Sequence, residues 1–139
     1  MRSFLFLSVM MATLSLYSCK KENAAQEMVK KTEQLLVGKW KVDKKTYDEY
    51  DPIPTLKTSE VIPGTESDQY YFKPEGTLAI SDGTATEEAT YQVMNPLQVR
   101  IDERHWWIKD LTSESVTLYV DRNDVEYNKR YVTKIFLKR

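Results

Sequence analysis

The alternation of apolar and polar side chains begins at residue 38 and continues in short runs to the end of the chain. In the first run, Trp40 and Val42 fall on one face, and Lys39 and Lys41 fall on the other. A period of two is typical of a half-buried antiparallel strand. No helical period follows Trp40, so this part of the chain is predicted to be all-β.

Turn signals such as Lys73-Pro74-Glu75-Gly76 separate these runs, and residues 121–124 are predicted to form the last turn. Sequential strands joined by short turns pair antiparallel, and eight of them can close into an up-and-down barrel. The predicted fold is an eight-stranded antiparallel barrel preceded by a short N-terminal helix. Such a barrel is filled by its side chains or holds one small ligand. The predicted strands cover residues 38–47, 69–72, 77–80, 86–94, 97–101, 105–111, 116–120 and 127–137.

Residues 50–68 interrupt this regular pattern. Pro52, Pro54 and Pro63, the last followed by Gly64, argue against a regular ladder because proline cannot donate a backbone hydrogen bond. Apolar residues are nevertheless spread through the segment. It is therefore predicted to be an ordered, irregular loop that folds over an apolar surface.

The first 18 residues have the composition of an export signal. Arg2 precedes an apolar run over residues 4–16, which is shorter than the roughly 20 residues that span a bilayer. Leu16-Tyr17-Ser18-Cys19 resembles the bacterial lipoprotein box, which implies acylation of Cys19, for example with palmitate, and removal of residues 1–18. Cys19 is the only cysteine, so it has no partner for an internal disulfide. The alternative is a free thiol in an uncleaved leader.

Acylation would tether the mature chain to a membrane without a transmembrane helix. Lys20 follows the cysteine in place of an aspartate, so the resemblance implies no retention at the inner membrane. The expected location is the outer membrane of a bacterial envelope, on either its periplasmic or its surface face.

The stretch after Cys19 is polar and charged. We expect residues 20–23 to be loose and residues 24–35 to form a helix, with Met28, Leu35 and Leu36 on one face. A solvated spacer over the whole stretch is the alternative. The predicted organisation is a signal peptide (1–18), a tether with a short helix (19–33) and one barrel domain (34–139).

Charge excludes one class of partner. Removal of residues 1–18 takes away one base, Arg2, so 19 basic and 21 acidic residues remain and the net charge is −2. Nucleic-acid binding needs a concentrated basic face, whereas bases and acids are interspersed here. We expect a monomer that does not bind nucleic acid.

The chain also resembles a known family, on five motifs in residues 33–139. They are LVGKW at 36–40, YFKPEGTL at 71–78, TYQV at 90–93, WIKDLT at 107–112 and VTL at 116–118. With these motifs the chain resembles the lipocalin-like domain lipoproteins of the Bacteroidetes type. The resemblance implies a lipocalin-like barrel with a possible apolar cavity, in which residues 50–68 cover the open end.

The motif Gly38-x-Trp40 resembles the opening motif of lipocalins, where the tryptophan packs across the closed end of the barrel. The same resemblance implies a basic residue on the last strand that packs over this tryptophan. Arg130 and Lys134 are both candidates, and the sequence does not choose between them.

Candidate chemistry is sparse. His105 is the only histidine, so an ordinary zinc site has no second nitrogen ligand and no cysteine in the domain. Asp121-x-Asn123-Asp124 lacks the remaining ligands of a calcium loop. Acids at positions 82, 87, 88, 102, 103, 121 and 124 could pair as acid and base, but most lie in predicted turns, where acids are expected. We expect no catalytic residue, no metal and no cofactor, and we do not expect an enzyme.

Two functions are compatible with this sequence. The first is a membrane-tethered binding module that holds a small apolar or amphipathic molecule between the barrel wall and residues 50–68. The second is a structural or interaction module of the envelope, whose filled barrel binds a protein or a glycan through its surface. Because Trp106 and Trp107 are adjacent, they must face opposite sides of the sheet, and an exposed aromatic side chain can serve as such a platform. The candidate wall residues for the first function are Trp40, Phe72, Leu78, Ile80, Tyr91, Val93, Val99, Ile108 and Leu118.

Overall fold

The computed structural model describes residues 22–139, which form a helix over residues 22–36 and nine strands. The predicted signal peptide and Cys19 lie outside the described residues. The strands are β1 (Gly38–Tyr50), β2 (Leu56–Pro63), β3 (Asp68–Phe72), β4 (Thr77–Asp82), β5 (Thr86–Asn95), β6 (Gln98–Ile101), β7 (Arg104–Lys109), β8 (Ser115–Asp124) and β9 (Lys129–Lys138).

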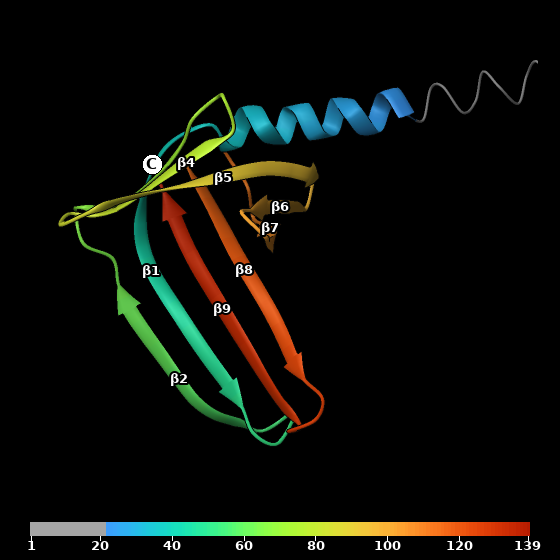
Figure 1. Cartoon of the computed structure of the whole chain (residues 1–139), viewed down its shortest axis with the longest axis vertical. Helices are drawn as coiled ribbons and strands as arrows, with labels where there is room; N and C mark the ends of the chain where they lie inside the picture. The colour runs from blue at the N-terminus through green and yellow to red at the C-terminus, as the bar shows by residue number, and fades with distance from the viewer. Residues whose placement is uncertain (1–21) are drawn as a thin grey trace, which may run out of the picture.

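Eight of these strands close a barrel. From β3 to β9 each strand pairs antiparallel with the next, and β1 pairs with both β3 and β9 (Figure 1). Strand β2 pairs with β1 and lies outside the ring. The predicted eight-stranded antiparallel barrel, preceded by a short helix, is confirmed.

The edge of β1 is shared between two strands. Residues 38–41 pair with β3, and residues 44–50 of the same strand pair with β2. On the opposite edge, β9 pairs with β1 over residues 41–50. The ring therefore closes only around the start of β1. Beyond it, β2 and the far ends of β1, β8 and β9 (residues 44–50, 120–124 and 129–136) form a four-stranded sheet, which we call the extension (Figure 1).

The prediction of an irregular loop over residues 50–68 was wrong, because this segment contains β2. Pro52 and Pro54 lie in the turn before the strand, and Pro63 is its last residue. Proline is tolerated at the ends of a strand, so the ladder between them is not interrupted. Every residue of β2 is exposed, and the strand widens the extension instead of folding over an apolar surface.

Gly64 explains how the chain passes from β2 to β3. A Cβ atom at this position would lie 1.8 Å from the carbonyl oxygen of Val42. The amide of Gly64 also donates a hydrogen bond of 2.9 Å to the carbonyl of Asp43. Only glycine lets the chain pass this close to the backbone of Val42. The segment between β2 and β3 can therefore stay at the same edge of β1, where both strands pair.

The last hairpin also differs from the prediction. Residues 121–124 were expected to turn, yet they pair with β9, and the turn follows at residues 125–128. Tyr127, expected in the final strand, is 64% exposed in this turn. Asp121 is accommodated in β8 because Arg130 of β9 forms an ion pair with its carboxylate.

The closed part of the barrel is filled by apolar side chains. Phe72 and Tyr91 meet edge to face, with ring centroids 5.0 Å apart and an interplanar angle of 86°. The Tyr91 hydroxyl donates a hydrogen bond of 2.8 Å to the carbonyl of Lys73. The core consists of Leu36, Trp40, Val42, Tyr70, Phe72, Leu78, Val93, Val99, Ile108, Val116, Leu118, Ile135 and Leu137.

The helix meets the barrel through its C-terminal half. Leu36 and Thr32 are buried, and Val29 packs against the core. Met28, which was expected on the apolar face, is 57% exposed. The buried stripe at spacings of three and four residues therefore starts one residue later than predicted.

Trp40 seals the closed end of the barrel, where the helix joins β1. Its indole N–H donates a hydrogen bond of 2.7 Å to the carbonyl of Leu36. The guanidinium of Arg139 lies 4.2 Å from the ring centroid of Trp40 and donates to the carbonyls of Leu35 and Val37 at 2.9 and 2.7 Å. It thus satisfies carbonyls that the end of the helix leaves free.

Neither of the two basic residues proposed from the sequence packs over Trp40. Arg130 and Lys134 lie further back on β9, whereas Arg139 follows the strand and reaches the closed end. Gly38 makes room for this contact, because it has a φ of 129° and a Cβ would lie 3.1 Å from the Arg139 guanidinium. The tryptophan was placed correctly, but its basic partner was not.

We expect Arg139→Ala to lower the free energy of unfolding by about 1–2 kcal/mol, because the cation–π contact and three hydrogen bonds of the guanidinium, the third to the carbonyl of Ser113, are lost. Urea denaturation measures this difference. Lys138→Ala is the matched control, because the Lys138 ammonium makes a surface ion pair with Asp43 that contributes little. Equal unfolding midpoints for the two variants would contradict the role of Arg139.

Candidate functional site

The nine candidate wall residues lie inside the barrel, but they form its packed core. Trp40, Phe72, Leu78, Val93, Val99, Ile108 and Leu118 are buried, and Ile80 and Tyr91 are partly buried against them. Their inward direction follows from strand alternation. These side chains fill the closed part of the barrel, and two hollows lie outside it, one on each face of the sheet that β8 and β9 share.

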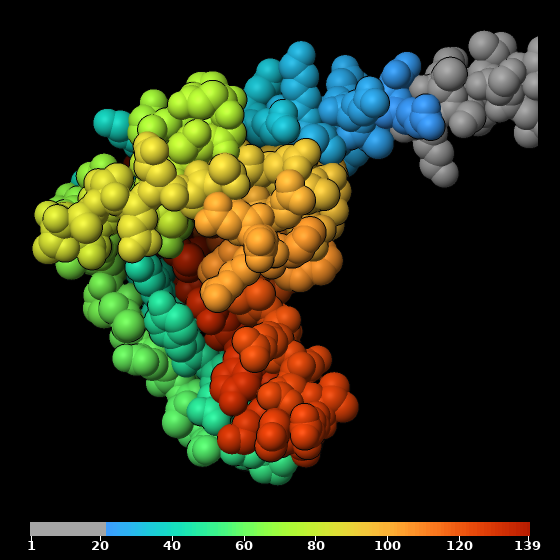
Figure 2. Space-filling view, viewed as in Figure 1, coloured from blue at the N-terminus to red at the C-terminus, as the bar shows by residue number. Residues whose placement is uncertain are grey.

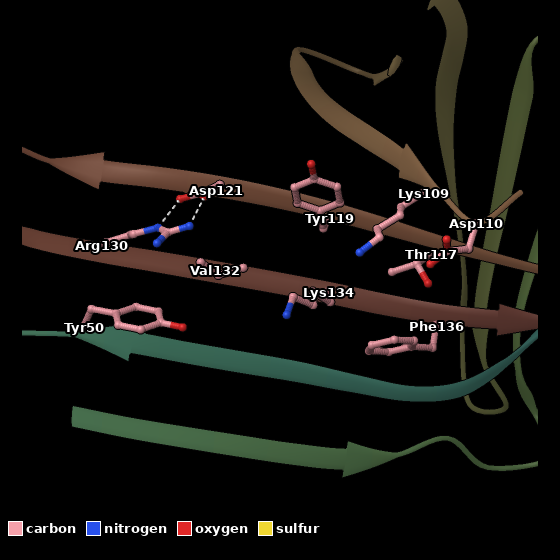
Figure 3. A pocket seen from close by; sticks show the side chains of 10 residues that line it. All are labelled: Tyr50, Lys109, Asp110, Thr117, Tyr119, Asp121, Arg130, Val132, Lys134 and Phe136. Atoms are coloured by element: carbon pink, nitrogen blue, oxygen red, sulfur yellow. Dashed lines mark hydrogen bonds and ion pairs between the residues drawn. The ribbon is translucent and has the colours of Figure 1, made fainter. Parts of the chain in front are cut away.

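A hollow of about 380 Å³, which we call the outer groove, lies on the outer face of the sheet (Figure 3). On β9 the groove residues alternate with Ile135 and Leu137, which belong to the core. Thr117 and Val132 are buried in the groove. It is lined by Tyr50, Lys109, Asp110, Thr117, Tyr119, Asp121, Arg130, Val132, Lys134 and Phe136.

Two lysines without an ion-pair partner in residues 22–139 give the outer groove positive charge. The side chains of Lys109 and Lys134 extend from β7 and β9 into the space beside Tyr119 (Figure 3). Among residues 22–139, neither ammonium group has an ion-pair partner within 4.0 Å. Asp110 lines the same end and carries the opposing charge there.

Aromatic rings border both ends of the outer groove. Tyr50 lies at one end and Phe136 at the other, with Tyr119 between them (Figure 3). Tyr119 stacks on Trp107, with centroids 6.5 Å apart and an interplanar angle of 25°. Trp107 is 42% exposed, so the groove continues into an open aromatic surface.

An ion pair fixes the end of the outer groove near the hairpin turn. Arg130 donates to both carboxylate oxygens of Asp121, with 2.9 Å between Nε and Oδ1. This hydrogen-bonded partner holds the pKa of Asp121 below its usual value. The same guanidinium lies 5.3 Å from the ring centroid of Tyr50.

The opposite face of the extension borders a second hollow, of about 570 Å³, which we call the mouth hollow. Figure 2 shows the molecule hollowed between the overhanging strands β5–β7 and the extension. The hollow exists because β7 pairs with β8 only from Trp107 to Lys109, and beyond Tyr119 β8 is paired with β9 alone. It is lined by Arg104, His105, Val120, Arg122, Asp124, Tyr131 and Thr133.

The structure also places the remaining residues that the sequence singled out. Trp106 is partly buried against the core and Trp107 is exposed outside, which confirms that the two face opposite sides. Asp121 lines the outer groove and Asp124 lines the mouth hollow, so the suggested calcium ligands point to opposite faces of β8. His105 is exposed and lines the mouth hollow.

Neither hollow was predicted from the sequence. Each hollow collects side chains from three or more strands, and no short motif links them. Strand alternation was the available signal, because Tyr119 and Asp121 share one face of β8 while Val120 and Arg122 share the other.

Comparison of the sequence with models of protein families and with curated proteins finds no significant match. The resemblance to lipocalin-like lipoproteins therefore stays a prediction. Within residues 22–139, no helix combines the length and the apolar character that a membrane crossing requires.

The ion pair between Asp121 and Arg130 makes part of the stability dependent on pH. Because the folded state lowers the pKa of Asp121, the contribution is present above its unfolded pKa of about 3.9. It is lost as the pH falls through the lower folded pKa. We expect Asp121→Asn to be less stable than the unchanged chain at pH 7, with a gap that closes below about pH 4.

Urea denaturation of both chains between pH 7 and pH 2 measures this gap. Asp48→Asn serves as the control, because no ion pair is found for Asp48 among the described residues. A gap between the Asp121 variant and the unchanged chain that persists at pH 2 would contradict the assignment.

Proposed function

We propose that this chain is a membrane-tethered envelope module that binds an acidic polysaccharide in the outer groove. The observation that carries the proposal is the convergence of Lys109 and Lys134, neither of them ion-paired within the described chain, on a groove bordered by aromatic rings (Figure 3). The filled barrel acts as the rigid base of this surface.

The chemistry of the outer groove favours a sugar chain with carboxylate groups. The C–H faces of a sugar ring pack on the electron-rich faces of Tyr and Trp rings, which Tyr119 and Trp107 present. Two lysine ammonium groups attract carboxylates without requiring one fixed geometry. The open shape and the exposed Trp107 suit a chain that continues beyond the groove.

A small ligand enclosed by the barrel is less well supported. The predicted wall residues pack against one another as a core, and β2 is exposed along its whole length instead of closing a cavity. Enclosing a ligand would require these side chains to separate, which costs the contacts of a close-packed interior.

We expect the groove to bind its glycan without cleaving it. A glycosidase needs a carboxylic acid whose pKa is raised so that it stays protonated and can donate a proton. Arg130 instead lowers the pKa of Asp121 and keeps it ionised. The tether rests on the sequence alone, through the export-type leader and Cys19.

Loss of the two lysine charges tests the proposal. We expect the double change Lys109→Gln and Lys134→Gln to weaken binding of polygalacturonate by about tenfold or more, since each ammonium contributes attraction to the carboxylates. Affinity electrophoresis of the purified full chain in gels that contain polygalacturonate measures the loss. Neutral dextran gives the background retardation.

The matched control is Lys30→Gln with Arg100→Gln, which removes the same net charge from two exposed residues that line neither hollow. It should leave polygalacturonate binding unchanged. Equal losses in both double variants would show attraction to net charge alone, and would contradict a site. Equal retardation by polyglutamate would show that the groove binds carboxylates without recognising the sugar ring, and would contradict a glycan site.

A further inference from the structure

We infer that the mouth hollow is a second, separate binding site, which takes a small organic anion. Arg104 and Arg122 would hold its phosphate or carboxylate group, and Val120 and Tyr131 would contact its apolar part. The two sites lie on opposite faces of β8, so this inference does not depend on the glycan site.

Both arginines line the hollow because β7 separates from β8 before either strand ends. The ladder between β7 and β8 ends at the pair Trp107–Tyr119. Arg104 lies beyond that point on β7, and Arg122 lies beyond it on β8. Two guanidinium groups therefore line one hollow from two strands that have separated.

Neither arginine is neutralised within the described chain. The ion pairs found in residues 22–139 include neither Arg104 nor Arg122. Two like charges that share a concave surface raise the local positive potential, which an anion lowers. A guanidinium group also presents two parallel donors that match the oxygens of a phosphate or carboxylate.

Two acids share this face of the sheet with the arginines. Asp124 lines the hollow, and its carboxylate accepts a hydrogen bond of 3.3 Å from the amide of Tyr127 in the hairpin turn. Glu49 of β1 lies opposite Tyr131 of β9 in the ladder. Its carboxylate oxygen Oε1 lies 3.5 Å from Nζ of Lys57 and 3.8 Å from Nζ of Lys129. Glu49 is thus paired with lysines, and the two arginines outnumber the one acid, Asp124, that lines the hollow.

The other lining residues suit an organic molecule better than a bare ion. Tyr131 offers a ring that is 38% exposed, Val120 adds apolar surface, and Thr133 adds a hydroxyl group. A volume of about 570 Å³ falls in the range of small-molecule sites. A ligand with a charged group and an apolar or aromatic body would use both parts.

The test is a titration of the full chain with phenyl phosphate, followed by the amide NMR signals of residues 104, 105, 122 and 131. Phenol and inorganic phosphate are titrated in parallel, because each carries only one of the two recognised parts. Vesicles that contain phosphatidylglycerol form a third arm, which distinguishes a lipid headgroup from a free anion.

We expect phenyl phosphate to bind more tightly than inorganic phosphate, and phenol to produce no shifts. Arg104→Gln with Arg122→Gln should weaken binding by about tenfold or more. Arg104→Lys with Arg122→Lys should bind at an intermediate level, because lysine keeps the charge and loses the paired donors. Lys109→Gln with Lys134→Gln should bind as the unchanged chain does.

Binding to the vesicles that the double arginine change abolishes would support the site and identify a lipid headgroup as its ligand. Failure of both phenyl phosphate and the vesicles to bind would overturn the inference. Equal weakening by the arginine and the lysine double changes would overturn it as well, because binding would then follow net charge and not the mouth hollow.

Discussion

The pairing of β1 determines the architecture, because one of its edges is divided between two strands. Its first residues pair with β3 and close the ring, and its later residues pair with β2 and extend the sheet beyond the ring. Gly64 makes the division possible by letting the chain cross close to the backbone of Val42. From this one constraint follow a small barrel that its side chains fill and an extension that borders a hollow on each face.

The fold was largely predictable because strand alternation and turn residues are local signals. The barrel and most of its strands follow from them. Strand β2 was missed because Pro52, Pro54 and Pro63 suggested a broken ladder, although each lies outside the interior of the strand. Arg139 was missed as the partner of Trp40 because their contact joins residues far apart in the sequence, and no local pattern encodes it.

The candidate sites were less predictable than the fold. Alternation correctly identifies Leu78 or Leu118 as inward-facing, but it does not tell whether inward side chains line a cavity or fill it. That distinction depends on the diameter of the ring and on packing between strands. The outer groove needs the register of β7, β8 and β9 to bring Lys109 and Lys134 to one groove, which no single stretch of sequence reveals.

The proposed function places binding in the outer groove, on the outer face of the sheet, and not inside the barrel. Hydrogen–deuterium exchange of the full chain, with and without polygalacturonate, tests it most directly, because exchange reports protection along each strand. The account predicts slower exchange in residues 115–136 of β8 and β9, and no change in β3 to β6. Protection confined to β3 to β6, or no protection at all, would contradict the account.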